Sequence, residues 1–257
     1  MKNGEQLNEL ALFAGAGGGI LGGKLLGWKC VCAVECDEYA RNVLIARQDD
    51  GCLDPFPIWN DVLSFDGKPW RGVVDIVTGG FPCQDISVAG KGSGIDGERS
   101  GLWSQMARII SEVSPRRVLV ENSPMLTFRG LGRVLGDLAQ MGFNTRYGVL
   151  GGYTAGGCAD GKRVWILADA SNSLGWFAPQ IQAQVVDPEK SSRREFERAI
   201  SACVSEEAHT ARLRDTDGMA RDVDRLRCAG NGQRPELVRL AWEILSKKDF
   251  ISDRITN

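Results

Sequence analysis

The sequence contains a single histidine, His209, in 257 residues. A Ser-His-Asp triad or a multi-histidine metal site needs imidazole at a defined place, so the sequence argues against both classes of site. The first residues lack an apolar signal segment, and the chain has no run of about 18 apolar residues that could span a bilayer. We therefore expect a cytoplasmic protein, in a bacterial cell or a phage-infected host, with no membrane partner.

Neither the net charge nor the cysteine spacing indicates a particular kind of binding site. The formal net charge is −2, so bulk electrostatics gives no support to nucleic-acid binding, which must rest on local residues. The 8 cysteines are irregularly spaced, which favours reduced thiols over a disulfide framework. Cys30, Cys32 and Cys36 have poor spacing for zinc and lie in an apolar stretch. We expect these three to be packing residues, and we expect no metal site.

The sequence does contain enough apolar residues, 43%, to bury the core of one main domain with a small appendage. Up to about residue 168, short apolar runs alternate with helix-like stretches, which is typical of βαβ units. We therefore predict an α/β fold with a parallel sheet covered by helices. The expected strands are 10–13, 31–34, 75–78, 117–120 and 164–167, and the expected helices are 21–28, 38–47, 102–113, 131–141 and 236–245. After Asp169 the composition becomes richer in Ser, Arg, Asp and Glu, which indicates a small second domain or a long insertion.

A glycine-rich turn follows the first predicted strand, in the stretch NELALFAGAGGG (8–19). Glycine lets a backbone approach a ligand closely, and Glu35, at the end of the next strand, can accept both hydroxyls of a ribose. Asp61 follows the next crossover, where a carboxylate could accept from an adenine amino group. The clustered glycines do not match the dinucleotide pattern, so the sequence favours a nucleoside without a pyrophosphate, with S-adenosylmethionine the obvious candidate. The turn glycines concerned are Gly15, Gly17 and Gly18.

A second candidate site is the cysteine in DIVTGGFPCQD (75–85). Pro82 fixes the backbone immediately before Cys83, which is predicted at the carboxyl end of a strand, where ligands bind in a doubly wound sheet. The polar, glycine-rich loop 84–101 suits a lid. Glu121 ends another strand at the same edge. A thiol beside a carboxylic acid, without histidine, suits attack on a ring carbon whose neighbouring nitrogen the acid engages.

With these residues the sequence resembles the DNA cytosine-5 methyltransferases, especially the short phage and bacterial type. The matching blocks occur in the family's order: FAGAGG (13–18), Glu35, Asp61, GGFPCQDIS (79–87), GERSGLW (97–103), VLVEN (118–122), KRVWILA (162–168) and GNGQRPELV (230–238). The resemblance implies a Rossmann-like S-adenosylmethionine-dependent fold. Its divisions would be a catalytic cofactor-binding domain (1–169), a small, reduced target-recognition region (170–227) and a segment returning to the catalytic domain (228–257).

The resemblance also implies a mechanism. Cys83 would add to C6 of cytosine, Glu121 would engage N3 and the exocyclic amine, and Arg163 would contact the base or its phosphate. The target base would be flipped out of the duplex. Phe13 would stack on the adenine of the cofactor.

The implied binding residues form two sets. Those for S-adenosylmethionine are Phe13, Gly15, Gly17, Gly18, Glu35, Asp61, Pro82 and Asn231. Those for double-stranded DNA are Gln84, Ser87, Arg99 and Lys162. The protein is expected to be a monomer serving restriction-modification, the protection of phage DNA or regulation.

Two alternatives remain open. One is a tRNA cytosine-5 methyltransferase, since a branch of the family acts on RNA with the same motifs. The other is a catalytically impaired nucleic-acid-binding paralogue. Gly161 stands where family members carry the first of two arginines, and the recognition region is short, so both features leave that reading open.

Overall fold

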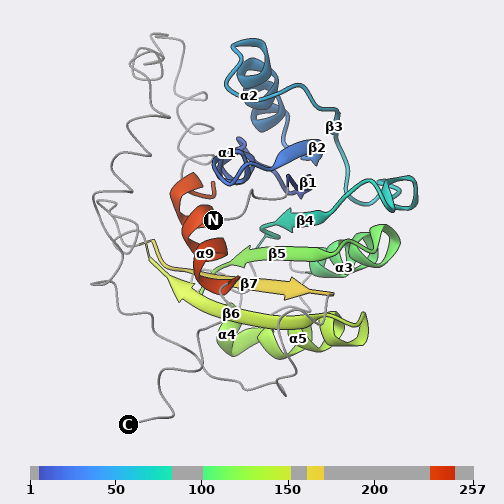
Figure 1. Ribbon diagram of the computed structural model, residues 1–257, viewed down its shortest axis with the longest axis vertical. Helices are drawn as coiled ribbons and strands as arrows, with labels where there is room; N and C mark the ends of the chain where they lie inside the picture. The colour runs from blue at the N-terminus through green and yellow to red at the C-terminus, as the bar shows by residue number, and fades with distance from the viewer. Residues whose placement is uncertain (1–5, 83–100, 152–160, 171–231, 247–257) are drawn as a thin grey trace.

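The computed structural model describes residues 6–82, 101–151, 161–170 and 232–246. Within them a 7-stranded sheet has the order β3-β2-β1-β4-β5-β7-β6, with helices on both faces (Figure 1). The strands are β1 (Asn8–Leu12), β2 (Lys29–Val34), β3 (Ile58–Trp59), β4 (Ile76–Gly79), β5 (Arg117–Asn122), β6 (Asn144–Leu150) and β7 (Arg163–Asp169). The helices are α1 (Gly18–Leu25), α2 (Glu38–Asp49), the short 3-10 helix η1 (Lys68–Trp70), α3 (Leu102–Val113), α4 (Leu126–Arg129), α5 (Leu131–Gln140) and α9 (Pro235–Leu245).

The strand directions confirm the predicted fold class and correct one detail. Strands β1 to β5 pair in parallel, whereas β7 is antiparallel to both β5 and β6. The sequence predicted the strand at 164–167 but not its direction, because an apolar run reads the same both ways. It missed β6, most of whose residues are only half-buried. The two-residue β3 was also too short to show a pattern.

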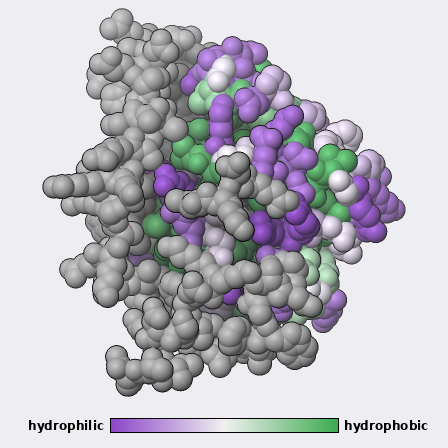
Figure 2. Space-filling model, viewed as in Figure 1, coloured by the Kyte–Doolittle hydropathy of each residue, from purple (hydrophilic) through white to green (hydrophobic). Residues whose placement is uncertain are grey.

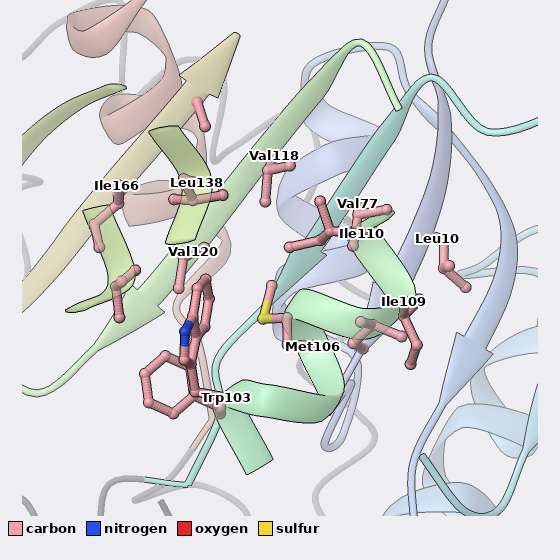
Figure 3. Packing of buried hydrophobic residues seen from close by; sticks show 14 of the residues in the cluster. Leu10, Val77, Trp103, Met106, Ile109, Ile110, Val118, Val120, Leu138 and Ile166 are labelled. Atoms are coloured by element: carbon pink, nitrogen blue, oxygen red, sulfur yellow. The ribbon is translucent and has the colours of Figure 1, made fainter. Parts of the chain in front are cut away.

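The main core fills the face of the sheet covered by α3 and α5 (Figure 3). Helix α3 buries Trp103, Met106, Ile109, Ile110 and Val113, a spacing that places them on one helical face. They pack against alternate residues of the central strands, which point to that face. Each such side chain stabilises the fold by about 1.5–3 kcal/mol relative to exposure. This layer fixes the strands whose carboxyl ends carry the site.

The opposite face is covered by α1 and α9, which are far apart in sequence and pack against each other. Leu119 and Trp165 belong to the cluster on this face, together with Val238 of α9. A Cβ atom added to Gly22 of α1 would lie 2.5 Å from Cβ of Val238. The two helices can therefore approach this closely only because position 22 has no side chain.

Helix α1 begins earlier than the sequence predicted. It spans Gly18–Leu25 instead of 21–28, and Trp28 lies beyond its end. Gly17, the residue before the helix, has φ +89°, a left-handed conformation that glycine adopts readily. The sequence predicted Gly18 and Gly19 in the glycine-rich turn, but they begin α1, where packing against the segment before α9 leaves no room for a side chain at either position.

Two of the three cysteines predicted to pack in the core do so, and the third does not. Cys30 and Cys32 are buried, and burial raises the pKa of Cys32 to about 11. Cys36 is exposed, so its predicted packing role is wrong: it lies beyond the end of β2, outside the core.

The visible described surface is largely hydrophilic (Figure 2). Large exposed apolar side chains on the described residues are Ile45, Trp59, Leu63, Val73 and Phe128. In this part of the chain, no helix combines the length and the hydrophobicity that crossing a membrane requires.

Candidate active site

The turn after β1 is closed by Glu35, which follows β2. The Gly15 N–H donates to Oε2 of Glu35 at 2.7 Å, and the Asp37 N–H donates to Oε1 at 2.8 Å. The Ala14 N–H donates to the Val34 carbonyl oxygen at 3.1 Å. Each carboxylate oxygen of Glu35 retains a lone pair for a further donor such as a hydroxyl group.

The three glycines predicted to bind the cofactor differ in their surroundings. Gly15 has φ +55°, and a Cβ added there would meet no described atom within 4 Å. Gly17 has φ +89°, and its Cβ would lie 2.7 Å from Cδ2 of Leu44. A Cβ on Gly18 would overlap the carbonyl oxygen of Gln233. Among the three, Gly15 therefore offers backbone beside open space, whereas the other two make room for α2 and the segment before α9.

Phe13 lies at the carboxyl end of β1 with φ +53°, a conformation that bulky residues rarely adopt. Such a backbone costs on the order of 1–3 kcal/mol and is found mainly at functional sites. Its ring is partly buried against the main core. This conformation leaves Phe13 at the start of the turn that Glu35 closes.

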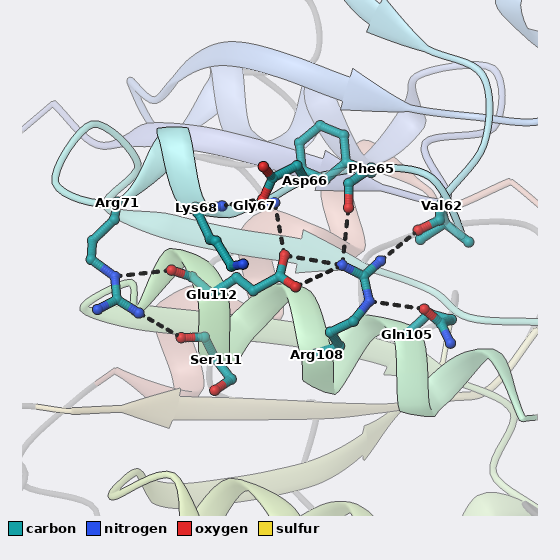
Figure 4. Close-up of polar contacts among 10 residues, drawn as sticks. All are labelled: Val62, Phe65, Asp66, Gly67, Lys68, Arg71, Gln105, Arg108, Ser111 and Glu112. Carbon is teal, nitrogen blue, oxygen red and sulfur yellow. Dashed lines mark hydrogen bonds and ion pairs between the residues drawn. The ribbon is translucent and has the colours of Figure 1, made fainter.

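Asp61 immediately precedes a segment that is tied to α3 (Figure 4). Its Oδ1 accepts from the Leu63 N–H at 2.8 Å. Arg108 of α3 donates to the carbonyl oxygen of Val62, within that turn, at 2.9 Å, and to that of Phe65, after it, at 3.0 Å. Backbone carbonyls in this segment are thus satisfied by one guanidinium.

Glu112, one turn further along α3, completes this attachment. It pairs with Arg108 at 2.8 Å, and its Oε2 accepts from the Gly67 N–H at 2.8 Å. Arg71 donates to the Glu112 carbonyl oxygen at 2.9 Å. The Asp61 segment is therefore positioned by α3, the helix that begins directly after residues 83–100 in the sequence.

The backbone approaching Cys83 is fixed to the strand that carries the acid. Asn122, the last residue of β5, is buried and donates from Nδ2 to the Phe81 carbonyl oxygen at 3.1 Å. A Cβ added to Gly80 would lie 2.5 Å from Oε2 of Glu121. The segment 80–82 and the end of β5 therefore share one edge of the sheet.

Glu121 and Arg163 come together because β7 runs opposite to β5. Glu121 pairs with Trp165, so Arg163, two residues earlier, lies on the same face of the neighbouring strand. The Arg163 Nε lies 2.9 Å from Oε1 of Glu121, whose side chain is 10% exposed. Burial raises the pKa of Glu121, while the charge of Arg163 and hydrogen bonds from Gln233 and Arg163 lower it. Burial is the largest of these effects, so the pKa of the carboxyl lies above its usual value.

Gln233 was not among the residues predicted for the site. Its Nε2 donates to Oε2 of Glu121 at 3.4 Å, across 112 residues of sequence. The available signal was its place in the block GNGQRPELV, two residues after Asn231, but nothing in that block shows what its side chain contacts.

Several predicted residues lie outside the described part of the chain. They are Cys83, Gln84, Ser87, Arg99 and Asn231. Pro82 is described and precedes Cys83 directly. Lys162 is exposed, and its carbonyl oxygen accepts from Arg163 Nη1 at 3.0 Å. The predicted division at residues 169 and 227 stays a prediction, because 171–231 are not described.

Comparison with known proteins shows the family. The family model of the C-5 cytosine-specific DNA methylases matches residues 7–225. The chain belongs to this family. The match covers the glycine turn, the cysteine block and the acid strand, and it extends through most of the predicted recognition region.

Type II methyltransferases are among the relatives of this family member. M.Eco47II of Escherichia coli is 39% identical over 130 residues, which are 49% of this chain and 29% of that protein. M.NgoBI of Neisseria gonorrhoeae is 33% identical over 174 residues, 66% of this chain and 53% of that protein. The aligned part of the chain therefore spans 29% to 53% of these two relatives' length.

Solved structures show the same fold. Spodoptera frugiperda DNMT2, in a mutant form, matches with a TM-score of 0.57 and 19% identity, over 72% of this chain and 56% of that one. The Dnmt2 methyltransferase of S. pombe matches with a TM-score of 0.53 and 21% identity, over 72% and 57% of the two chains. These likenesses establish the Rossmann-like methyltransferase fold.

Proposed function

We propose that this family member is a DNA cytosine-5 methyltransferase that moves a methyl group from S-adenosylmethionine to C5 of cytosine in double-stranded DNA. The observation that carries the proposal is the hydrogen bond that links Asn122, next to Glu121, to the segment before Cys83. Asn122 holds the Phe81 carbonyl at 3.1 Å, and Cys83 follows only two residues later. Adjacent Cα atoms are about 3.8 Å apart, so chain connectivity supports a thiol near the edge that carries the acid.

The chemistry then follows from the two groups. Cytosine becomes nucleophilic at C5 only after a nucleophile has added to C6. The Cys83 thiolate adds there, while Glu121 in its protonated form donates to N3 and accepts from the exocyclic amine. S-adenosylmethionine supplies an electrophilic methyl group when it is bound. The C5 proton is then lost to a base, and the Cys83 thiolate leaves, which restores the aromatic ring.

The raised pKa of Glu121 serves this mechanism. A carboxyl that holds its proton nearer to neutral pH can act as a hydrogen-bond donor to a ring nitrogen. Arg163 opposes that effect and keeps the carboxyl in one orientation through Oε1. Such an acid does not need histidine, consistent with a chain that has a single one.

The residues near the glycine turn fit S-adenosylmethionine. Gly15 lies beside open space, and the carboxylate of Glu35 keeps lone pairs directed at the turn. We infer that Glu35 holds the ribose hydroxyls, Phe13 packs on the adenine and Asp61 accepts from its amino group. We further propose that the protein is a cytoplasmic monomer and that it acts on a base flipped out of the duplex. Its role would be in restriction-modification or phage protection.

The test is transfer of labelled methyl from S-adenosylmethionine to duplex DNA and, separately, to tRNA. We expect labelled DNA, and we expect Cys83→Ser to abolish transfer while cofactor binding measured by calorimetry is retained. The wild-type protein should form a covalent adduct with duplex DNA containing 5-fluorocytosine, which traps the enzyme because the fluorine at C5 cannot leave as a proton does.

Other outcomes would change the assignment. Label in tRNA alone would indicate the RNA enzyme. No label in either substrate, with cofactor still bound, would indicate the binding paralogue. Bisulfite sequencing of DNA from expressing cells would then name the target sequence of an active enzyme.

A further inference from the structure

Gln233 lies where three parts of the site meet. It precedes α9 by two residues, and its backbone carbonyl oxygen lies against Gly18 at the start of α1. Its side-chain Oε1 lies against Gly19, so closely that an added Cβ would overlap it. The first backbone N–H groups of a helix have no partners within the helix, so this end favours an acceptor. The amide oxygen of Gln233 therefore faces the electropositive end of α1.

The other end of the same amide faces the acid. Nε2 of Gln233 donates to Oε2 of Glu121 at 3.4 Å. The same Nε2 would lie 3.1 Å from a Cβ added at Gly80, three residues before Cys83. One side chain thus lies against the start of α1, the segment before Cys83 and the acid.

The two oxygens of Glu121 have different partners. Oε1 is paired with the Arg163 guanidinium of β7, at 2.9 Å, and Oε2 with the neutral amide of Gln233. A carboxylic acid at position 233 would place a second anion against Glu121. An amide instead presents its acceptor to α1 and its donor to the acid, so glutamine suits this position at both ends.

We propose that Gln233 is a positioning residue for Glu121: its amide fixes the Oε2 edge of the carboxyl and connects it to the start of α1. As the amide acts on Glu121 rather than on the reacting atoms, its contribution is orientation and a hydrogen bond to the ionised form. The role in transfer rests on the proposed function, whereas the contact itself does not.

The direct test is a titration of Glu121 by carbon-13 NMR in protein labelled at the glutamate carboxyl carbons. The signal is assigned by its loss in Glu121→Gln. Gln233→Met keeps the length of the side chain but removes the donor, so the ionised carboxylate loses a hydrogen bond. We expect the pKa of Glu121 to rise by about half a unit to one unit. Gln233→Glu should raise it further, because a second carboxylate opposes ionisation.

Activity supplies a second readout. In Gln233→Met, kcat should fall about tenfold, while the KM for DNA and the Kd for S-adenosylhomocysteine change less than twofold. The limb of the pH-rate profile due to Glu121 should move with the pKa measured by NMR. Arg163, the charged partner of Glu121, is unchanged in this variant. A shift in the pKa of Glu121 therefore reports on the loss of the amide.

Val238→Ala is the matched control. It weakens the contact between α9 and Gly22 without touching Glu121. We expect a lower Tm in this control with an unchanged pKa and kcat. If Gln233→Met behaves in the same way, losing stability alone, the residue is merely structural and the inference is overturned.

The two proposals can fail separately. Absence of methyl transfer by the wild-type protein would remove the proposed function, yet the NMR titration would still decide whether Gln233 controls Glu121. Normal transfer with an unshifted pKa and kcat in Gln233→Met would refute the role of Gln233 and leave the proposed function standing.

Discussion

The side-chain amide of Asn122 donates to the carbonyl oxygen of Phe81 at 3.1 Å, and both residues are buried. This hydrogen bond joins the end of β5 to the segment that precedes Cys83. The Asn122 Oδ1 accepts from the Ser123 N–H at 2.8 Å, so both ends of the amide are engaged. The position of residues 80–82 relative to Glu121 thus depends on an amide that belongs to neither.

Asn122→Asp should slow the formation of the 5-fluorocytosine adduct by about tenfold or more. The variant keeps an acceptor for Ser123 but removes the donor to Phe81, and a lost hydrogen bond of this kind costs about 1–3 kcal/mol when its partner stays buried. Single-turnover adduct formation measures the effect. Asn8→Asp is the matched control, since Asn8 Nδ2 donates to the Val73 carbonyl at 2.9 Å, on a strand end away from the site. An equal loss in both variants would refute the specific role of Asn122.

Gly22→Ala should lower the free energy of unfolding by about 2 kcal/mol, the usual scale for overpacking. Its Cβ would lie 2.5 Å from Cβ of Val238, and α1 and α9 would have to separate. Gly136→Ala, in α5, is the opposite case, because its Cβ would meet no described atom within 4 Å. That variant should gain about 0.5–1 kcal/mol from helix propensity. Urea denaturation measures the free energy of unfolding of both variants. A change in the same direction in both would contradict the packing argument.

Arg108→Met should weaken S-adenosylhomocysteine binding several-fold and lower stability by about 1–3 kcal/mol, because it leaves carbonyl oxygens of the Asp61 segment without their donor. Calorimetry measures the affinity and thermal denaturation the stability. Arg47→Met removes an exposed pair with Asp50 and serves as the control, expected to change stability by less than about 1 kcal/mol. Unaltered binding in Arg108→Met would show that the segment holds its shape without α3.

Glu9 should make stability depend on pH. Burial raises its pKa to about 8, and its Oε1 accepts from the Thr78 hydroxyl at 2.6 Å, while Oε2 has no hydrogen-bond partner among the described residues. The folded protein holds this proton more tightly than the unfolded chain, whose carboxyl titrates near 4.5. The stabilisation is therefore complete below about pH 4.5 and is lost as the pH rises through about 8.

Glu9→Gln tests this linkage, since the amide keeps the acceptor for Thr78 and cannot ionise. Relative to the wild type, the variant should gain on the order of a few kcal/mol in unfolding free energy between pH 5 and 9. The measurement is urea denaturation across that range. Glu38→Gln, on the exposed start of α2, should leave the wild-type slope in place. A constant difference between wild type and Glu9→Gln at every pH would show that Glu9 does not titrate there.

The sequence by itself determined the strands β1, β2, β4, β5 and β7, because each is an apolar run ended by a turn or a charged residue. It also placed Glu35 beside the glycine turn. That pairing is local in a βαβ unit, where successive parallel strands bring their carboxyl ends to one edge. The same reasoning predicted Glu121 at that edge. These features follow from patterns within a few tens of residues.

Only the tertiary structure decided which faces meet. The contact of Gln233 with Glu121 spans 112 residues, and Arg163 reaches that acid because β7 is reversed in the sheet. The apolar period of a helix or strand shows that a face is buried, but not against which partner. For the same reason the sequence could not show that the missing side chain of Gly18 makes room for the backbone of Gln233. Close packing of distant segments, not local propensity, made that choice.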